Sequence, residues 1–148
     1  MISRFSRLVL GAVVLGGLAL GGGVARAEGS LVGAVAGKPY VVTVAPVSGA
    51  KGQPVKAQVV IRPAAGYHMN EEFPTTLKLS PTAGVAFSKA ALAKQDAVMS
   101  KQECRFDVQM TGSEAGKKSV TGNLSFAVCT ETTCDPQKTP VTIELTVK

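Results

Sequence analysis

Short stretches of alternating apolar and polar residues recur along the chain from residue 40 to the C-terminal end. Such an alternation predicts a strand with one face in the core and the other in water. It is clearest in residues 104–110, where one phase is charged or polar and the other consists of Cys104, Phe106, Val108 and Met110. The same criterion, together with β-branched runs, predicts strands at residues 40–44, 55–61, 76–79, 85–88, 104–110, 120–128 and 141–147.

Turn-forming residues separate these strands. The Ser-Pro-Thr-Ala-Gly sequence at residues 80–84 and the charged, glycine-containing segment at residues 112–118 are typical of turns. Residues 89–101 are rich in alanine and fit either a short helix or a long loop. Several short strands without a βαβ unit predict an all-β fold, an immunoglobulin-like antiparallel β-sandwich.

Residues 1–27 have the features of a cleavable secretory signal peptide. Arg4 and Arg7 precede an uncharged run over residues 8–24, and the small-x-small sequence Ala25-Arg26-Ala27 follows. A retained membrane anchor is the alternative, but the run is glycine-rich and shorter than the ~20 apolar residues that span a bilayer. We therefore expect the mature protein in the periplasm, with an extracellular location as the alternative, and not embedded in the membrane.

Behind the signal peptide we expect a flexible lead-in at residues 28–38 and a single domain at residues 39–148, present as a monomer. Loss of the three signal-peptide arginines leaves 13 basic residues against 10 acidic ones, so the mature chain is only mildly basic. Apart from Lys117-Lys118 the basic residues are scattered, and few aromatic residues accompany them. A nucleic-acid-binding function is therefore disfavoured.

The chain has three cysteines, an odd number for an exported protein. Cys104 falls on the apolar phase of its strand, where a free thiol behaves as a small inert hydrophobic group. Cys129 falls on the polar phase at the end of its strand. Cys129 and Cys134 bracket Thr130-Glu131-Thr132-Thr133, a loop short enough to bring two Cβ atoms into bonding range. Closing so short a loop stabilises a fold by only ~2 kcal/mol on the chain-entropy formula.

Spacing alone leaves two hypotheses for this pair: a structural disulfide in a non-catalytic binding module, and a redox-active disulfide. The neighbouring Glu131 and Asp135 oppose thiolate formation, and the pair lacks the two-residue spacing and the helix N-terminus that lower a thiol pKa in thioredoxin-like proteins. If the pair exchanges electrons, we expect the attacking thiolate to come from a partner protein.

Two segments resemble a known family. Phe126-Ala127-Val128-Cys129 through Cys134-Asp135-Pro136, and Gly66-Tyr67-His68-Met69-Asn70, are similar to the N-terminal periplasmic domain of the thiol:disulfide interchange protein DsbD. The resemblance covers residues 39–147 and implies an immunoglobulin-like domain that relays electrons through Cys129 and Cys134. It further implies that Cys134 enters the mixed disulfide, and that the partners are thioredoxin-like or membrane-embedded thiol-disulfide exchange proteins.

Two features depart from that family. The sequence up to Lys148 carries neither a membrane-embedded electron conduit nor a thioredoxin-like domain, so we expect the donor to be a separate protein. The family shields its cysteines with a cap loop that bears an aromatic residue, but residues 89–103 contain none. Tyr67 and Phe73 are the candidate substitutes.

His68 is the sole histidine, and two roles are open for it: a supporting group near the cysteine pair, or a loop residue that shapes the turn over residues 66–70. A third hypothesis joins His68 and Met69 to the two cysteines as soft ligands for Cu(I), although no tight ligand spacing supports it. We expect no cofactor and no bound metal. With one histidine and no nucleophile elbow, hydrolase chemistry is disfavoured.

Overall fold

The computed structural model of the protein describes residues 37–148. The predicted signal peptide and most of the predicted lead-in lie outside the described residues. The described chain forms eleven strands and one short 3-10 helix. In chain order these are β1 (Tyr40–Val44), β2 (Val47–Gly49), β3 (Pro54–Pro63), β4 (His68–Met69), β5 (Thr76–Leu79), β6 (Val85–Phe87), β7 (Ala91–Ala93), η1 (Lys94–Asp96), β8 (Ala97–Met99), β9 (Cys104–Gly112), β10 (Gly116–Cys129) and β11 (Cys134–Val147).

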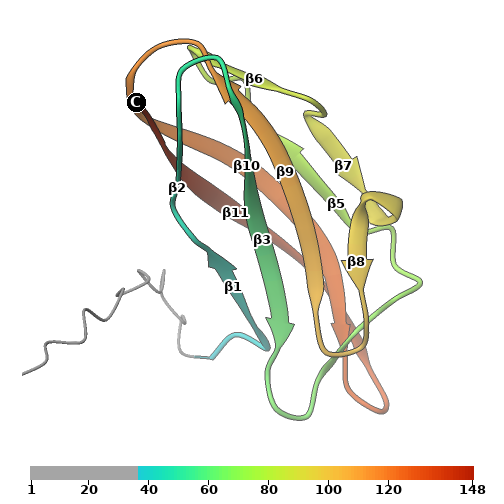
Figure 1. The fold of residues 1–148 in the computed structure, drawn as a ribbon. Coiled ribbons are helices and arrows are strands. Elements are labelled where there is room, and N and C mark those ends of the chain that lie inside the picture. Colours follow the sequence, from blue (N-terminus) through green and yellow to red (C-terminus); the bar gives the residue numbers. More distant parts are fainter. Residues whose placement is uncertain (1–36) are drawn as a thin grey trace, which may run out of the picture.

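The strands form two sheets that pack face to face (Figure 1). One sheet has the order β1-β3-β9-β6, with β8 also paired to β9. The other has the order β2-β11-β10-β5-β7, with β4 also paired to β10. All strand pairs are antiparallel except β2–β11, which is parallel. The predicted immunoglobulin-like antiparallel β-sandwich is therefore confirmed.

The inner faces of the two sheets enclose one hydrophobic core. Buried residues alternate with partly or fully exposed ones along β9 and most of β10, as the period-two pattern predicts. Tyr40 closes the core edge-on against Phe126, with the ring centroids 4.7 Å apart. The largest fully buried side chains include Phe106, Phe126, Ile61, Met69, Leu77, Met110, Leu124, Ile143 and Leu145.

All predicted strands are present, but several boundaries differ. β10 begins at Gly116 and β9 ends at Gly112, so the turn predicted over residues 112–118 is shorter than the sequence suggested. Residues 89–101 are neither an α-helix nor a long loop, because β7, η1 and β8 carry the chain from one sheet to the other. β2, β4, β7 and β8 were not predicted, since strands of two or three residues are too short to show a period.

Three turns meet at one end of the sandwich, at the bottom of Figure 1. They are the turn between β3 and β4, the turn between β8 and β9, and the tip of the β10–β11 hairpin. The Met69 N–H donates a hydrogen bond to the Lys101 carbonyl oxygen (2.8 Å), which joins the first two turns. Pairing of β4 with the end of β10 joins the first to the third. Residues far apart in sequence are thus gathered at this end.

Candidate functional site

Two cysteines face each other at the tip of the β10–β11 hairpin. Cys129 ends β10, Cys134 begins β11, and the two are direct partners in the antiparallel ladder. Their sulfurs form a disulfide, with the Cα atoms 3.9 Å apart. In the turn, the Thr130 N–H donates to the Thr133 carbonyl oxygen (2.8 Å), and the Thr133 N–H donates to Thr130 Oγ1 (3.1 Å). Hydrogen bonds as well as the disulfide therefore organise the turn.

The two cysteines differ in exposure. Cys129 is only 3% exposed, whereas Cys134 is exposed to solvent. Cys129 lies on the outer face of its sheet, because it is out of phase with the core residues Phe126 and Val128. The sequence predicted this phase correctly, but the outer face is covered at this point. A visiting thiol therefore meets Cys134 first.

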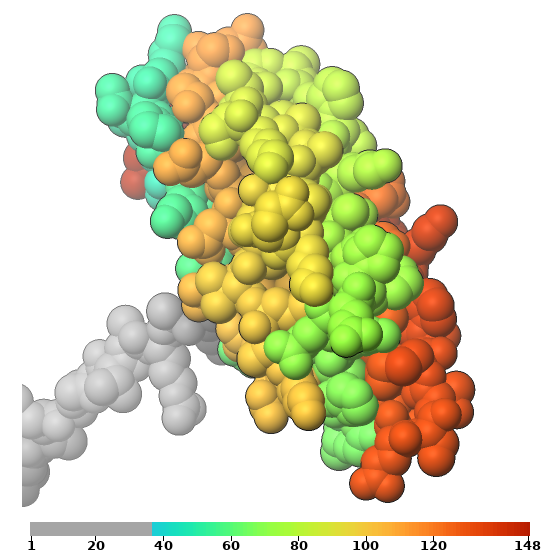
Figure 2. All heavy atoms as spheres, turned by 90° about the vertical axis from the view of Figure 1, so that its right-hand side faces the viewer, coloured from blue at the N-terminus to red at the C-terminus, as the bar shows by residue number. Residues whose placement is uncertain are grey.

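The Gly66 to Asn70 motif lies directly beside the cysteine pair. Gly66 adopts a positive φ of 82°, a conformation that favours glycine, in the turn that delivers the chain to β4. β4 then pairs with the end of β10, so that His68 lies opposite Cys129 and Met69 lies opposite Val128. In Figure 2 the hairpin tip, coloured orange-red, adjoins the green segment that precedes β5. The fold thus brings together the two motifs that carry the family resemblance.

Asn70 contacts the exposed cysteine, and the sequence did not single it out as a site residue. Its Nδ2 lies 3.7 Å from Cys134 Sγ, and its backbone N–H donates to the Ala127 carbonyl oxygen (2.9 Å). One signal was present in the sequence. Asn70 is two residues after His68, so an extended chain places both side chains on the face of the sheet that carries Cys129.

The chain matches no protein-family model and no curated protein. Its fold is similar to that of solved structures. AggA, the major subunit of aggregative adherence fimbriae type I from Escherichia coli, is 15% identical, with 75% of this chain and 97% of that chain covered and a TM-score of 0.39. Murine CRIg is 13% identical over 74% of this chain and 98% of that one, with a TM-score of 0.38. At these identities the likeness concerns the fold alone.

The two aromatic candidates flank the β4 segment. Tyr67 precedes β4 and is 38% exposed, and Phe73 is half-buried in the turn that follows Asn70. The Phe73 N–H donates to Asn70 Oδ1 (3.2 Å), which ties this turn to the site. Residues 89–101 contribute no hydrogen bond to either cysteine in the part of the chain that the structure describes. A shielding role for Tyr67 or Phe73 stays a prediction.

The four donors of the copper hypothesis do not converge. Met69 is 1% exposed and packs in the core opposite Val128, whereas Cys129 and its ladder partners His68 and Cys134 point to the other face. Within residues 37–148, no group of three or more histidine, cysteine, aspartate or glutamate side chains is arranged to hold a metal ion. The thioether therefore cannot join the other three donors in this fold.

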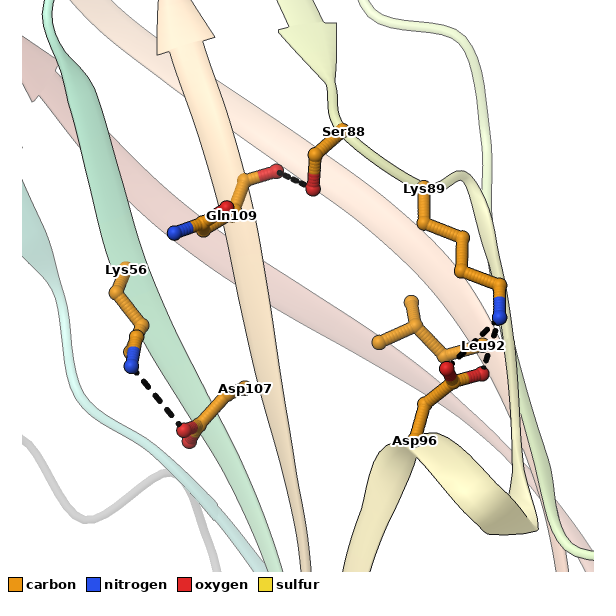
Figure 3. A pocket seen from close by; sticks show the side chains of 7 residues that line it. All are labelled: Lys56, Ser88, Lys89, Leu92, Asp96, Asp107 and Gln109. Atoms are coloured by element: carbon orange, nitrogen blue, oxygen red, sulfur yellow. Dashed lines mark hydrogen bonds and ion pairs between the residues drawn. The ribbon is translucent and has the colours of Figure 1, made fainter.

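A pocket of about 280 Å³ lies away from the cysteines, between the outer face of β3 and β9 and the segment from Ser88 to Asp96 (Figure 3). Its charges are paired within the chain, because Lys89 contacts Asp96 at 2.6 Å and Lys56 contacts Asp107 at 3.4 Å. A hydrogen bond from the Ala93 N–H, and secondly the Lys89 ammonium, hold the pKa of Asp96 below its usual value. The pocket offers no unpaired charge to a ligand.

Cys104 is fully buried and free, as its place on the apolar phase predicted. Burial, and secondly the nearby Glu103 carboxylate, raise the pKa of the Cys104 thiol to about 12. The thiol therefore remains protonated at neutral pH and takes no part in exchange.

No helix within residues 37–148 has the length and the apolar character needed to cross a bilayer. The segment predicted to be a signal peptide lies outside this range, and its cleavage remains a prediction.

Proposed function

We propose that the protein is a periplasmic thiol-disulfide exchange module that relays electrons through Cys129 and Cys134, as the N-terminal domain of DsbD does. The observation that supports this proposal most directly is the asymmetry of the disulfide, which joins a buried cysteine to an exposed one at the tip of a hairpin. One accessible sulfur gives an incoming thiolate a defined point of attack. The position of the second resemblance motif beside this disulfide supports the same function.

The exchange takes place in two steps. A thiolate of a dithiol partner attacks Cys134 Sγ, the bond between Cys129 and Cys134 breaks, and the Cys129 sulfur leaves with the electron pair and takes up a proton. The second thiol of the partner then attacks the partner's first sulfur, which is bonded to Cys134 in the mixed disulfide. This step releases Cys134 as a thiolate. The partner ends as a disulfide and this chain as a dithiol. The reverse sequence passes both electrons to the disulfide of an acceptor.

Thioredoxin-like or membrane-embedded thiol-disulfide exchange proteins fit the donor role. In the oxidised module both sulfurs of the pair are held in the disulfide and Cys104 is buried, so the attacking thiolate comes from the partner. A donor of the thioredoxin type supplies such a thiolate, because its own nucleophilic cysteine has a lowered pKa.

The decisive experiment is a redox titration of the mature chain from Glu28, with Cys104→Ala as the background so that only the pair responds. We expect a reduction potential between about −270 and −120 mV, the range of thioredoxin-like and periplasmic exchange proteins. A Cys129→Ser variant should trap a mixed disulfide through Cys134. The matched Cys134→Ser variant should trap far less, because its remaining thiol is buried.

A non-catalytic binding module with a structural disulfide is the competing function. The hydrogen-bonded turn between the two strands is compatible with this function, since a structural disulfide would then reinforce a hairpin that hydrogen bonds already hold. That function predicts a potential below about −300 mV and no trapped partner. Both results together would rule out the relay.

A further inference from the structure

The orientation of the Asn70 side chain is set by the turn that follows β4. Its Oδ1 accepts hydrogen bonds from the backbone N–H groups of Glu72 (2.9 Å) and Phe73 (3.2 Å). An amide nitrogen cannot accept from an N–H group, so these two donors determine which end of the amide is oxygen. The nitrogen end must therefore point the other way, toward Cys134.

The contact between Asn70 Nδ2 and Cys134 Sγ changes in strength with the redox state of the sulfur. In the disulfide the sulfur is a weak hydrogen-bond acceptor, and the separation is 3.7 Å. A thiolate carries a full negative charge, and hydrogen bonds to ionised acceptors are shorter and roughly twice as strong. A donor aimed at this sulfur therefore favours the thiolate over both the thiol and the disulfide.

In the described part of the chain, the charged groups around Cys134 form no hydrogen bond with its sulfur. Asp135 is its immediate neighbour, but alternation along β11 directs the Asp135 side chain to the opposite face, where its carboxylate accepts a hydrogen bond from Gln137. The remaining titratable groups on the neighbouring elements are Tyr67 before β4, His68 on β4, Glu71 and Glu72 after β4, Lys101 before β9, Glu131 in the turn and Lys138 on β11. Within residues 37–148, the Asn70 amide makes the only side-chain hydrogen bond to the Cys134 sulfur.

We propose that Asn70 is a positioning residue that stabilises the Cys134 thiolate. This inference rests on the proposed function. In the second exchange step Cys134 leaves the mixed disulfide as a thiolate, and the Asn70 amide is in place to receive the charge. When the reduced module acts on an acceptor, the same hydrogen bond raises the fraction of Cys134 that can attack.

The test measures the pKa of Cys134 from the pH dependence of its alkylation, in a Cys129→Ser background. Cys104 does not interfere, because burial raises the pKa of its thiol to about 12. We expect Asn70→Ala to raise the pKa of Cys134 by about one unit, a tenfold fall in thiolate fraction at neutral pH. Peptide-level alkylation of the reduced parent chain and its Asn70→Ala form repeats the measurement without the Cys129 substitution.

Asn70→Asp distinguishes the effect of the hydrogen bond to sulfur from the effect of Asn70 on the structure of the turn. Its carboxylate can still accept from the Glu72 and Phe73 N–H groups, but it cannot donate to sulfur. Thr133→Asp adds the same charge next to Cys134 while Asn70 stays intact. We expect Asn70→Asp to raise the pKa of Cys134 more than Thr133→Asp does.

Two outcomes would overturn the role of Asn70: an unchanged pKa in Asn70→Ala, or equal shifts in the two aspartate variants. These outcomes are independent of the relay itself, because alkylation needs no redox partner. A clear pKa shift, combined with a potential below about −300 mV and no trapped partner, would support the Asn70 hydrogen bond and reject the relay.

Discussion

His68 lies directly opposite Cys129 across the β4–β10 ladder, although the two are 61 positions apart in sequence. Side chains of such directly opposed residues lie on the same face of the sheet, with Cβ atoms about 4.5–5.5 Å apart. Cys129 therefore has Cys134 on one side and His68 on the other. Of the two roles open for the histidine, this position favours a supporting group that covers Cys129.

The first prediction concerns this cover. His68→Ala should speed alkylation of Cys129 in the reduced protein several-fold, because removal of the imidazole opens the outer face beside the sulfur. Alkylation of the already exposed Cys134 should change little. Mass spectrometry of the labelled peptides gives both rates. Lys78→Ala, on β5 of the same sheet, is the control and should leave the Cys129 rate unchanged. Equal Cys129 rates in His68→Ala and the parent would contradict this role.

The second prediction follows from the burial of Cys104. Its pKa is raised to about 12 in the folded protein, mainly by desolvation, from a value of 9.0 without that environment. A raised pKa contributes stability that is complete below the unfolded pKa and is lost as the pH rises toward the folded one. The free energy of unfolding should therefore fall above about pH 9, by up to about 1.4 kcal/mol per pH unit from this group.

Urea unfolding of the parent and of Cys104→Ala over this alkaline range isolates that contribution. The variant has a lower overall stability because of the cavity, but its stability should decrease less steeply with pH. Lysine and tyrosine titrations are common to both proteins and cancel in the difference. Parallel pH profiles would mean that the thiol ionises equally well in the folded and unfolded chains.

The third prediction concerns acid stability. The Ala93 N–H, and then Lys89, lower the pKa of Asp96 from 3.8, so this group contributes stability above its unfolded pKa and loses it as the pH falls through the folded one. Asp96→Asn should therefore be less stable than the parent at neutral pH and should approach it in acid. Thermal unfolding at several pH values measures the stability difference between the variant and the parent. Lys94 is exposed on the same 3-10 helix, and Lys94→Ala serves as the control. A stability difference that stays constant with pH would contradict the assignment.

Period-two alternation was sufficient to predict the architecture. It placed Phe106, Phe126 and Cys104 in the core, and all three are buried. It failed where burial does not follow the period. Residues 126–129 are buried on both phases, so the phase of Cys129 indicated its face correctly but not its accessibility.

The candidate site could be predicted only in part, because it depends on contacts between distant segments. The short loop between Cys129 and Cys134 indicated a disulfide, and the structure shows it. The approach of Asn70 to Cys134 depends on β4, whose two residues are too few for a pattern, and on hydrogen bonds of Asn70 to the turn that follows. Sequence spacing places Asn70 on the same face as His68, but it does not show which distant residue that face meets.

The fourth prediction tests the packing between the ends of β9 and β11. Gly112 is buried, and a Cβ at this position would overlap the side chain of Val147, which is itself buried. Gly112→Ala should therefore destabilise the fold by about 1–3 kcal/mol through overpacking. The double variant with Val147→Ala should lose less free energy of unfolding than the sum of the losses in the two single variants, because the smaller side chain at position 147 makes room for the added methyl group. Urea unfolding of the three variants measures the coupling, and strict additivity would show that the two side chains do not compete for space.

The last prediction is that both redox states are folded, which a relay requires. Reduction removes a link that closes a very short loop, so it should lower the free energy of unfolding by only about 2 kcal/mol on the chain-entropy formula. Thr130 holds the turn independently, because its backbone N–H and its Oγ1 both bond to Thr133. Thr130→Val removes the side-chain acceptor and should destabilise the reduced protein more than the oxidised one, since the disulfide still closes the turn in the latter. Urea unfolding in the presence and absence of a strong reductant gives the free energy of unfolding of the parent and of Thr130→Val in both redox states. Global unfolding of the parent on reduction would show that the disulfide is required for folding, and would favour the structural staple over the relay.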